Sequence, residues 1–382
     1  MNRREFLGMA ALLPLLGSLP IQALAAPGEA KGNQRILVLV KLAGGNDGLN
    51  TLVPYTDPLY YQYRPTIGIP KHQVLDIGQN YGLNPYLKAL QPWWGKGNLA
   101  WVQGIGYPHP DLSHFRSIDI WETAVDSGSY ADSGWLGTLL PGCKPGLHGI
   151  VIGDNSGPLL GKNCHTIAME SPQTFLSQIR LLEDMPPAGN NPVLAHLTNV
   201  QHQLYAAGEQ LSTKLQRPVA LGMNFSTSEI GRDLEAVAKM ILSGVDATVY
   251  MVTLDGFDTH TSQANVQSNL LNHLAGALDS FAQAMQRGGR WNDVLLMTYS
   301  EFGRRVQENH GKGTDHGAAS VQLVMGGKVQ GGIYGDRPDL KQLDGDGNLQ
   351  YTVDFRKVYG TVAKNWLGQR HPWEQFGVLP FV

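Results

Sequence analysis

Runs of consecutive apolar residues recur along the chain and predict strands that are buried on both faces. The clearest runs cover residues 35–42, 99–105 and 247–254, and another begins at Val294. Unbroken Val, Leu and Ile runs of this length are typical of parallel strands with helices on both sides. Shorter strands are predicted at residues 149–152, 165–168 and 321–325.

Segments with helical spacing of apolar positions lie between these strands and after the last of them. They cover residues 85–94, 108–124, 173–183, 192–215, 228–242, 262–286 and 354–366. Strands that alternate with helices predict an α/β fold with a mostly parallel central sheet and helices on both faces. We therefore expect residues 26–382 to form a single domain, with a helical insertion around residues 173–243.

The first 25 residues have the pattern of a signal peptide for the twin-arginine export pathway. Arg3 and Arg4 precede Glu-Phe-Leu-Gly and an apolar stretch over residues 9–24. Ala-Leu-Ala at residues 23–25 fits a cleavage site, so we predict that the mature chain begins at Ala26. The implied partner during export is the twin-arginine translocase, and the implied location is the periplasm.

An uncleaved membrane anchor is the alternative interpretation of this apolar stretch. Pro14, Gly17 and Pro20 interrupt it, which makes it poorly suited to span a bilayer as one helix. We therefore expect no stable membrane span in the mature form.

Composition narrows the class of protein. The chain has 382 residues, 46 glycines, 16% charged residues and a net charge of −3. A chain with this charge and no basic run after its first residues is not expected to bind nucleic acid. Cys143 and Cys164 are the two cysteines; they either pair in an oxidising compartment or stay as buried thiols, and they are too few for a structural zinc site.

Acidic and histidine side chains follow the predicted strands where those strands end. The first strand is followed by Gly-Gly-Asn-Asp-Gly with Asp47, and the strand at 247–254 is followed by Asp258 and His260. The strand that begins at Val294 is followed by Glu301. Ligands bind beyond the carboxyl ends of strands in open α/β sheets, so these groups mark a candidate site. Solvated turns, or a helix cap at Asp258, are the alternative interpretation.

The loop after Glu301 contains further charged and histidine side chains that could belong to the site. It contains Arg304 and ends in Asp315-His316-Gly317. Ser113 lies at the start of the helix at 108–124, where free N–H groups and the helix dipole favour an anion or an activated hydroxyl. Ser113 is therefore either a nucleophile or an ordinary helix N-cap.

Several of these motifs together resemble the bacterial DUF1501 family of exported twin-arginine proteins, and the order of the acidic groups resembles the alkaline phosphatase superfamily. The resemblance covers nearly the whole mature chain. The segments that carry it are RREFLG, LAGGNDGLNTLVPY, SHFRSIDIWET, SGWLG, GFDTH, SEFGRR, GTDHG and DFRKVY. It implies an alkaline phosphatase-like or sulfatase-like fold with metal ligands at strand ends.

The resemblance also implies roles for single residues. Ser113 would be the nucleophile, and Arg304 would neutralise charge on the ester oxygens. The implied metal ligands are Asp47, Asp258, His260, Glu301, Asp315 and His316. Phe302 stands where phosphatases of the superfamily commonly have a ligating histidine, so one ligand of a two-zinc site is absent.

These residues predict a periplasmic metal-dependent hydrolase of phosphate or sulfate esters. The implied cofactor is a divalent metal ion, zinc, calcium or manganese, and the implied substrate is a small-molecule or glycan ester. Two alternatives stay open: a non-catalytic exported protein that uses the same fold for binding or envelope assembly, and an enzyme of another class such as a glycan transferase.

Overall fold

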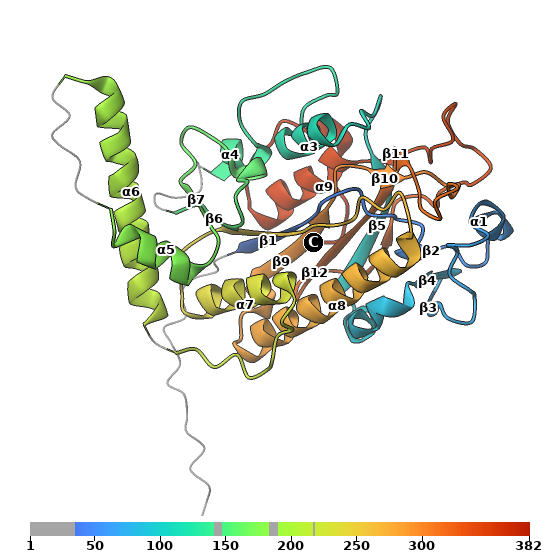
Figure 1. Ribbon diagram of the computed structural model, residues 1–382, viewed down its shortest axis with the longest axis horizontal. Helices are drawn as coiled ribbons and strands as arrows, with labels where there is room; N and C mark the ends of the chain where they lie inside the picture. Colours follow the sequence, from blue (N-terminus) through green and yellow to red (C-terminus); the bar gives the residue numbers. More distant parts are fainter. Residues whose placement is uncertain (1–34, 141–146, 183–189, 217) are drawn as a thin grey trace, which may run out of the picture. The chain divides into compact units, whose positions relative to one another are not determined.

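The computed structural model describes residues 35–140, 147–182, 190–216 and 218–382 (Figure 1). These residues belong to one compact unit. The predicted signal peptide and Cys143 lie outside the described residues. Cys164 is buried, and its pairing with Cys143 stays a prediction.

Strands and helices follow one another along the described chain, and the elements from Val294 to Asp354 are all strands. The strands are β1 Ile36–Leu42, β2 Leu52–Val53, β3 Leu75–Gly78, β4 Tyr81–Leu83, β5 Leu99–Gly106, β6 Gly149–Ile152, β7 Thr166–Met169, β8 Val249–Leu254, β9 Val294–Tyr299, β10 Gly303–Arg304, β11 His316–Gly317, β12 Ser320–Gly326, β13 Gly332–Tyr334 and β14 Val353–Asp354. The α-helices are α1 Pro58–Tyr63, α2 Gln91–Gly95, α3 His114–Thr123, α4 Trp135–Leu139, α5 Pro172–Ile179, α6 Pro192–Leu215, α7 Glu229–Leu242, α8 Gln263–Arg287 and α9 Phe355–Thr361.

A large central sheet organises the described residues. Its strand order is β13-β5-β12-β9-β1-β8-β6-β7, and β14 pairs with β5. Strands β9, β1, β8, β6 and β7 are parallel to one another. Strand β12 runs antiparallel to both of its neighbours, β5 and β9, so β5 points the same way as β9. The prediction of a mostly parallel sheet is confirmed.

Alternate side chains of β1 enter two different hydrophobic cores. Val38 and Val40 pack on one face of the sheet, with side chains from α2, α7 and α8. Leu37 and Leu39 pack on the other face, with side chains from α3, α4 and α9. Figure 1 shows α7 and α8 on one side of the sheet and α3 and α9 on the other. Period-two burial of an apolar strand requires this double cover, and helices on both faces are confirmed.

Helices α5, α6 and α7 occupy the range predicted as a helical insertion. Asn191 caps α6 by accepting hydrogen bonds from two backbone N–H groups, and Ser228 caps α7 by accepting one from the backbone N–H of Gly231. Helix α7 packs on α8 and β8, whereas α6 contacts α5 and α7. That these helices are an insertion into a larger family fold stays a prediction.

The parallel strands place their carboxyl ends at one edge of the sheet. Strands β1, β8 and β9 are adjacent there, and the segments after them contain Asp47, Asp258 and Glu301. Strand β5 ends at the same edge and leads into the loop before α3. Within the described residues, no helix combines the length and the apolar character needed to cross a membrane.

Candidate metal centre

Asp258 lies at the middle of a cluster of side chains beyond the end of β8. Its side chain is 48% exposed, so it faces solvent although the backbone around it is tightly packed. Gly44, in the segment after β1, has a φ of +113°, and a Cβ there would lie 2.3 Å from the backbone nitrogen of Asp258. Only glycine allows this approach, which fixes Asp258 against the end of β1.

Three imidazole rings surround the Asp258 carboxylate. The Nε2 atoms of His260 and His316 lie 3.1 and 3.2 Å from its Oδ1 atom, and Nε2 of His114 lies 3.5 Å from its Oδ2 atom. The Nε2 atoms of His260 and His316 are 3.0 Å apart. Ligand atoms of His114, Asp258 and His316 all lie within 4.8 Å of one another.

Each of these rings has its other nitrogen next to an acceptor. Nδ1 of His114 lies 2.9 Å from Oε1 of Glu301, and Nδ1 of His260 lies 3.3 Å from Oδ1 of Asp315. Nδ1 of His316 lies 2.8 Å from the carbonyl oxygen of Leu112. Each of these oxygens accepts a hydrogen bond, so Nδ1 donates and Nε2 keeps its lone pair in each neutral ring.

The resulting set of atoms fits a divalent metal ion. The Asp258 carboxylate has the Arg304 guanidinium as a partner, but the Nε2 atoms of His260 and His316 face each other at 3.0 Å, and two lone pairs at that distance repel unless a cation or a proton lies between them. Ligand atoms around a tetrahedral zinc ion are about 3.3 Å apart, close to the separations of 3.0–3.5 Å around Asp258. Among the described residues, no other group of three or more His, Cys, Asp or Glu side chains comes as close together.

The electrostatics of the cluster keep its members in the forms that bind a metal. Burial alone would raise the pKa of Asp258, but the hydrogen bond from Arg304, the nearby His316 ring and the charge of Arg304 outweigh it, and the pKa is lowered to about 2. Burial lowers the pKa of His316 below its usual value. Asp258 is therefore ionised and His316 neutral at neutral pH.

Glu301 contacts the His114 ring and positions it. Besides its contact with His114, Oε1 accepts a hydrogen bond of 2.7 Å from the backbone N–H of Gly44. The residue is 4% exposed. The structure thus brings Glu301 to the candidate centre, as the sequence predicted, in a place where it orients a histidine.

Phe302 packs against the histidines. Its ring stacks on that of His316, with centroids 4.3 Å apart, and lies 4.9 Å from that of His114. The residue is 2% exposed. The side chain that replaces the expected histidine therefore occupies space beside the cluster and adds no ligand.

Asp47 does not join the cluster, contrary to the expectation that it shares an ion with Asp258. Its residue exposure is 1%, and its Oδ2 atom lies 2.5 Å from Nη1 of Arg64 and also accepts a hydrogen bond from Gln263. Its Oδ1 atom accepts from the backbone N–H groups of Leu49 and Asn50. Both carboxylate oxygens already have protein partners, so Asp47 is a buried structural anion.

Arg304 and Asp315 each contact one member of the cluster: Arg304 contacts Asp258, and Asp315 contacts His260. The Arg304 side chain is fully buried and donates to the carbonyl oxygens of Gly45, Thr314 and Phe257 and, at 2.8 Å, to Oδ1 of Asp258. A buried guanidinium with these partners orients Asp258 and has no free face for an ester. Asp315 contacts His260, as described above, and contributes no oxygen to the group around Asp258.

Ser113 occupies the N-cap position of α3, but its hydroxyl makes no capping hydrogen bond. The residue is exposed. Its neighbours on both sides take part in the cluster, because the Leu112 carbonyl contacts His316 and His114 contacts Asp258. The alternative interpretation of Asp258 as a helix cap is wrong, since α8 begins at Gln263 and its N-cap is Ser262.

His114 is the member of the cluster that the sequence interpretation missed. The signal that could have found it is its position: it follows β5, whose carboxyl end lies at the same edge of the sheet as those of β1, β8 and β9. A histidine in the first turn after such a strand meets the criterion that was applied to Asp47 and Asp258.

Residues 228–362 match the model of one protein family, described as "Protein of unknown function (DUF1501)". The matched stretch includes Asp258, His260, Glu301 and His316, and it begins after Ser113 and His114. No curated protein matches the sequence.

Several solved structures resemble this one at low sequence identity. The zinc complex of the C-terminal periplasmic domain of EcEptC from Escherichia coli is 11% identical, with 90% of this chain and 85% of that chain covered and a TM-score of 0.43. The phosphonate monoester hydrolase SpPMH from Silicibacter pomeroyi is 10% identical, with 91% and 76% covered and a TM-score of 0.43. A protein in the alkaline phosphatase superfamily from Vibrio parahaemolyticus is 10% identical, with 79% and 62% covered and a TM-score of 0.38. These scores are too low to assign an activity.

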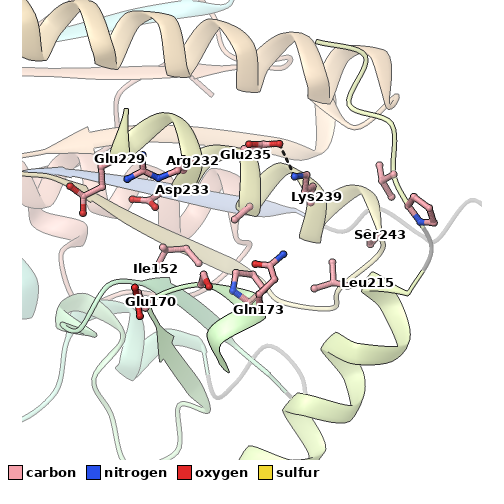
Figure 2. Close-up of a pocket in the computed structure, with 15 residues that line it drawn as sticks. Ile152, Glu170, Gln173, Leu215, Glu229, Arg232, Asp233, Glu235, Lys239 and Ser243 are labelled. Carbon is pink, nitrogen blue, oxygen red and sulfur yellow. Dashed lines mark ion pairs between the residues drawn. The ribbon is translucent and has the colours of Figure 1, made fainter. Parts of the chain in front are cut away.

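A separate cavity of about 560 Å³ lies beyond the ends of β6 and β7, between these strands and α5, α6 and α7 (Figure 2). Glu170, Glu229 and Asp233 line it together with Arg232, and Lys239 forms an ion pair of 2.6 Å with Glu235. Burial, and then the charge of Glu229, raises the pKa of Asp233 to about 7.

Asp233 should make stability depend on pH. A carboxyl whose pKa is raised by folding contributes stability below its unfolded pKa, near 4, and that stability is lost as the pH rises to about 7. We expect Asp233→Asn to raise the melting temperature relative to the parent protein at pH 8 and to have a smaller effect at pH 4. Glu209→Gln, on the exposed surface of α6, is the control; an equal effect of Asp233→Asn at both pH values would contradict the assignment.

Proposed function

We propose that this protein is a metal-dependent hydrolase of phosphate or sulfate esters that acts after export from the cytoplasm. The observation that supports it is the convergence of three imidazole Nε2 atoms on the Asp258 carboxylate, with Ser113, whose hydroxyl caps no helix, next to His114 in the chain. A purely structural histidine cluster has no need for three lone pairs that point toward one carboxylate. A serine beside such a centre is placed for nucleophilic catalysis.

The proposed centre holds one divalent ion through His114, Asp258 and His316, with His260 as the fourth candidate ligand. Imidazole-rich sites suit zinc better than calcium, which prefers oxygen ligands. Asp47 and Phe302 cannot complete a second site, because the first is paired with Arg64 and the second is apolar. When bound, a divalent ion supplies Lewis-acid polarisation and neutralises negative charge on the ester.

The chain's own residues supply the remaining chemistry. Ser113 Oγ attacks the phosphorus or sulfur atom, the alcohol of the ester leaves, and water then releases the inorganic product from Ser113. The N-terminus of α3 favours the negative charge that develops at Ser113. Glu301 holds the ring of His114, and Arg304 holds Asp258, so both ligands are fixed in place.

Export through the twin-arginine pathway belongs to the proposal. It is supported by the Arg3-Arg4 motif, the apolar stretch over residues 9–24 and the small residues before Ala26. This pathway carries folded proteins, so a metal ion bound in the cytoplasm would be retained.

A non-catalytic binding protein is the second candidate. The observation that favours it is the state of Arg304: the cation that the sequence assigned to the ester is buried and bonded to carbonyl oxygens and Asp258. Phosphoryl and sulfuryl transfer depend on cations that contact the equatorial oxygens, and this candidate predicts metal binding without turnover.

Replacing Ser113 with Ala tests the proposed nucleophile. Aryl phosphate and aryl sulfate esters are first screened with zinc, manganese and calcium to find an activity. Ser113→Ala should then lower kcat/KM at least about a thousandfold. Metal content should be unchanged, and the free energy of unfolding should change by less than about 0.5 kcal/mol, because no capping bond is lost.

Ser129→Ala is the matched control, since Ser129 is also exposed and its hydroxyl makes no hydrogen bond among the described residues. If Ser113→Ala keeps most of the activity, the covalent mechanism is wrong. If no ester is hydrolysed while the metal binds, the binding-protein candidate is preferred.

A further inference from the structure

A cavity of about 570 Å³ is lined in part by Asp315. Three segments form its walls: residues 62–66 at the end of α1, the loop 305–315 between β10 and β11, and the turn at 343–347. Asp315 links the cavity to the candidate centre, because it lines the cavity and its Oδ1 atom also contacts His260. The volume is in the range of sites for small ligands.

The loop that forms one wall is held in a fixed conformation by Asn309. Its Oδ1 atom accepts hydrogen bonds from the backbone N–H groups of Gly311 and Gly313. Its Nδ2 atom donates to the carbonyl oxygen of His260 and to Oδ1 of Asp315. The cavity is therefore preorganised and fixed relative to His260.

Most of the carboxylates that line the cavity accept hydrogen bonds from other groups of the protein. Glu308 accepts hydrogen bonds from the backbone N–H groups of Thr66 and Ile67 and from the Thr66 hydroxyl. Asp315 accepts from Asn309 and His260. Asp346 is the lining carboxylate without a side-chain partner among the described residues.

Two cations that line the cavity have no direct hydrogen-bond partner in the described part of the chain. Arg305 and Lys312 line it, and neither side chain makes a hydrogen bond or an ion pair with the described residues. The Nε atom of Arg305 is buried without a partner. The two Nη groups of Arg305 and the Lys312 ammonium have no partner within this part of the chain and are not buried, so an anionic group on a ligand would accept charge-assisted hydrogen bonds from them.

We propose that this cavity binds a second anionic group, a sulfate, phosphate or carboxylate, on the part of the substrate that does not react. Under the proposed function, on which this inference rests, the substrate is then a polyanion such as a multiply charged glycan. One charged group lies at the centre around Asp258 and another lies near Arg305 and Lys312. Binding energy from such a remote group contributes to catalysis and to specificity.

The test compares the binding of probes with one and two anionic groups. Isothermal titration calorimetry is carried out on the metal-loaded Ser113→Ala protein, which prevents turnover. The probes are a disulfated disaccharide with its monosulfated counterpart, and a sugar bisphosphate with its monophosphate. At least one doubly charged probe should bind at least tenfold more tightly than its singly charged counterpart, and Arg305→Ala with Lys312→Ala should abolish that difference.

The matched control is Arg180→Ala with Lys162→Ala, which removes an arginine and a lysine outside the cavity and should leave the difference unchanged. Equal binding of both members of each pair to the parent, or a preference that survives loss of Arg305 and Lys312, would overturn the proposal. These outcomes concern binding alone, so they are distinguishable from failure of the proposed hydrolysis, which the ester screen detects.

Discussion

Replacing Asp258 with Ala is expected to lower the metal content from about one ion per chain to about zero. Asp258 is the carboxylate around which the three imidazole rings converge, and without it the centre has no charged ligand. Any hydrolysis of esters should be lost with the metal. Elemental analysis after dialysis measures the metal content, and the rise in melting temperature on addition of zinc reports metal binding independently, because a ligand stabilises only the state that binds it.

Two further variants show whether the loss is specific. Asp255→Ala removes an exposed carboxylate three residues earlier in the same segment and should leave metal content unchanged. Asp315→Asn, which alters the partner of His260, should weaken metal binding about 10- to 100-fold without abolishing it. Metal retained at the parental level by Asp258→Ala would show that the ion lies elsewhere.

Arg64→Ala should destabilise the folded protein by about 3–5 kcal/mol, because it leaves the buried Asp47 carboxylate without its cation. The Arg64 side chain is fully buried and also donates to the side chain of Asn50 and to the carbonyl oxygens of Val306 and Arg305. Unfolding in urea measures the loss as a lower midpoint at unchanged slope.

Combining Arg64→Met with Asp47→Asn removes both charges and should cost less than Arg64→Ala alone. Asp47→Asn should also keep the metal content of the parent protein, because Asp47 is outside the group around Asp258. Loss of metal in Asp47→Asn would restore the sequence-based assignment of Asp47 as a ligand and contradict the role given to it here.

The central strands could be predicted from the sequence because a strand that is buried on both faces needs apolar residues at consecutive positions. The predicted strand at 35–42 is β1 Ile36–Leu42, and the predicted helix at 192–215 is α6 Pro192–Leu215. The short strands β2, β3 and β4 were not predicted. They contain two to four residues each, too few for a period to be visible.

The candidate site was predicted in part. Strand ends pointed to Asp258 and His260, and the loop after Glu301 pointed to His316; the structure brings these three side chains together. The ion pair of Asp47 with Arg64 could not be predicted, because Arg64 is 17 residues away, after α1. No local sequence pattern marks the pair. The burial of Arg304 likewise depends on carbonyl groups from three separate segments.

The most direct test of the central claim is the metal content of the full mature chain, purified without a metal-affinity tag and loaded with zinc or manganese before dialysis. One ion per chain is predicted, held by His114, Asp258 and His316 and absent from Asp258→Ala. No retained ion after loading would contradict a metal centre at this edge of the sheet. Two ions per chain would contradict the inference that Asp47 and Phe302 leave room for one.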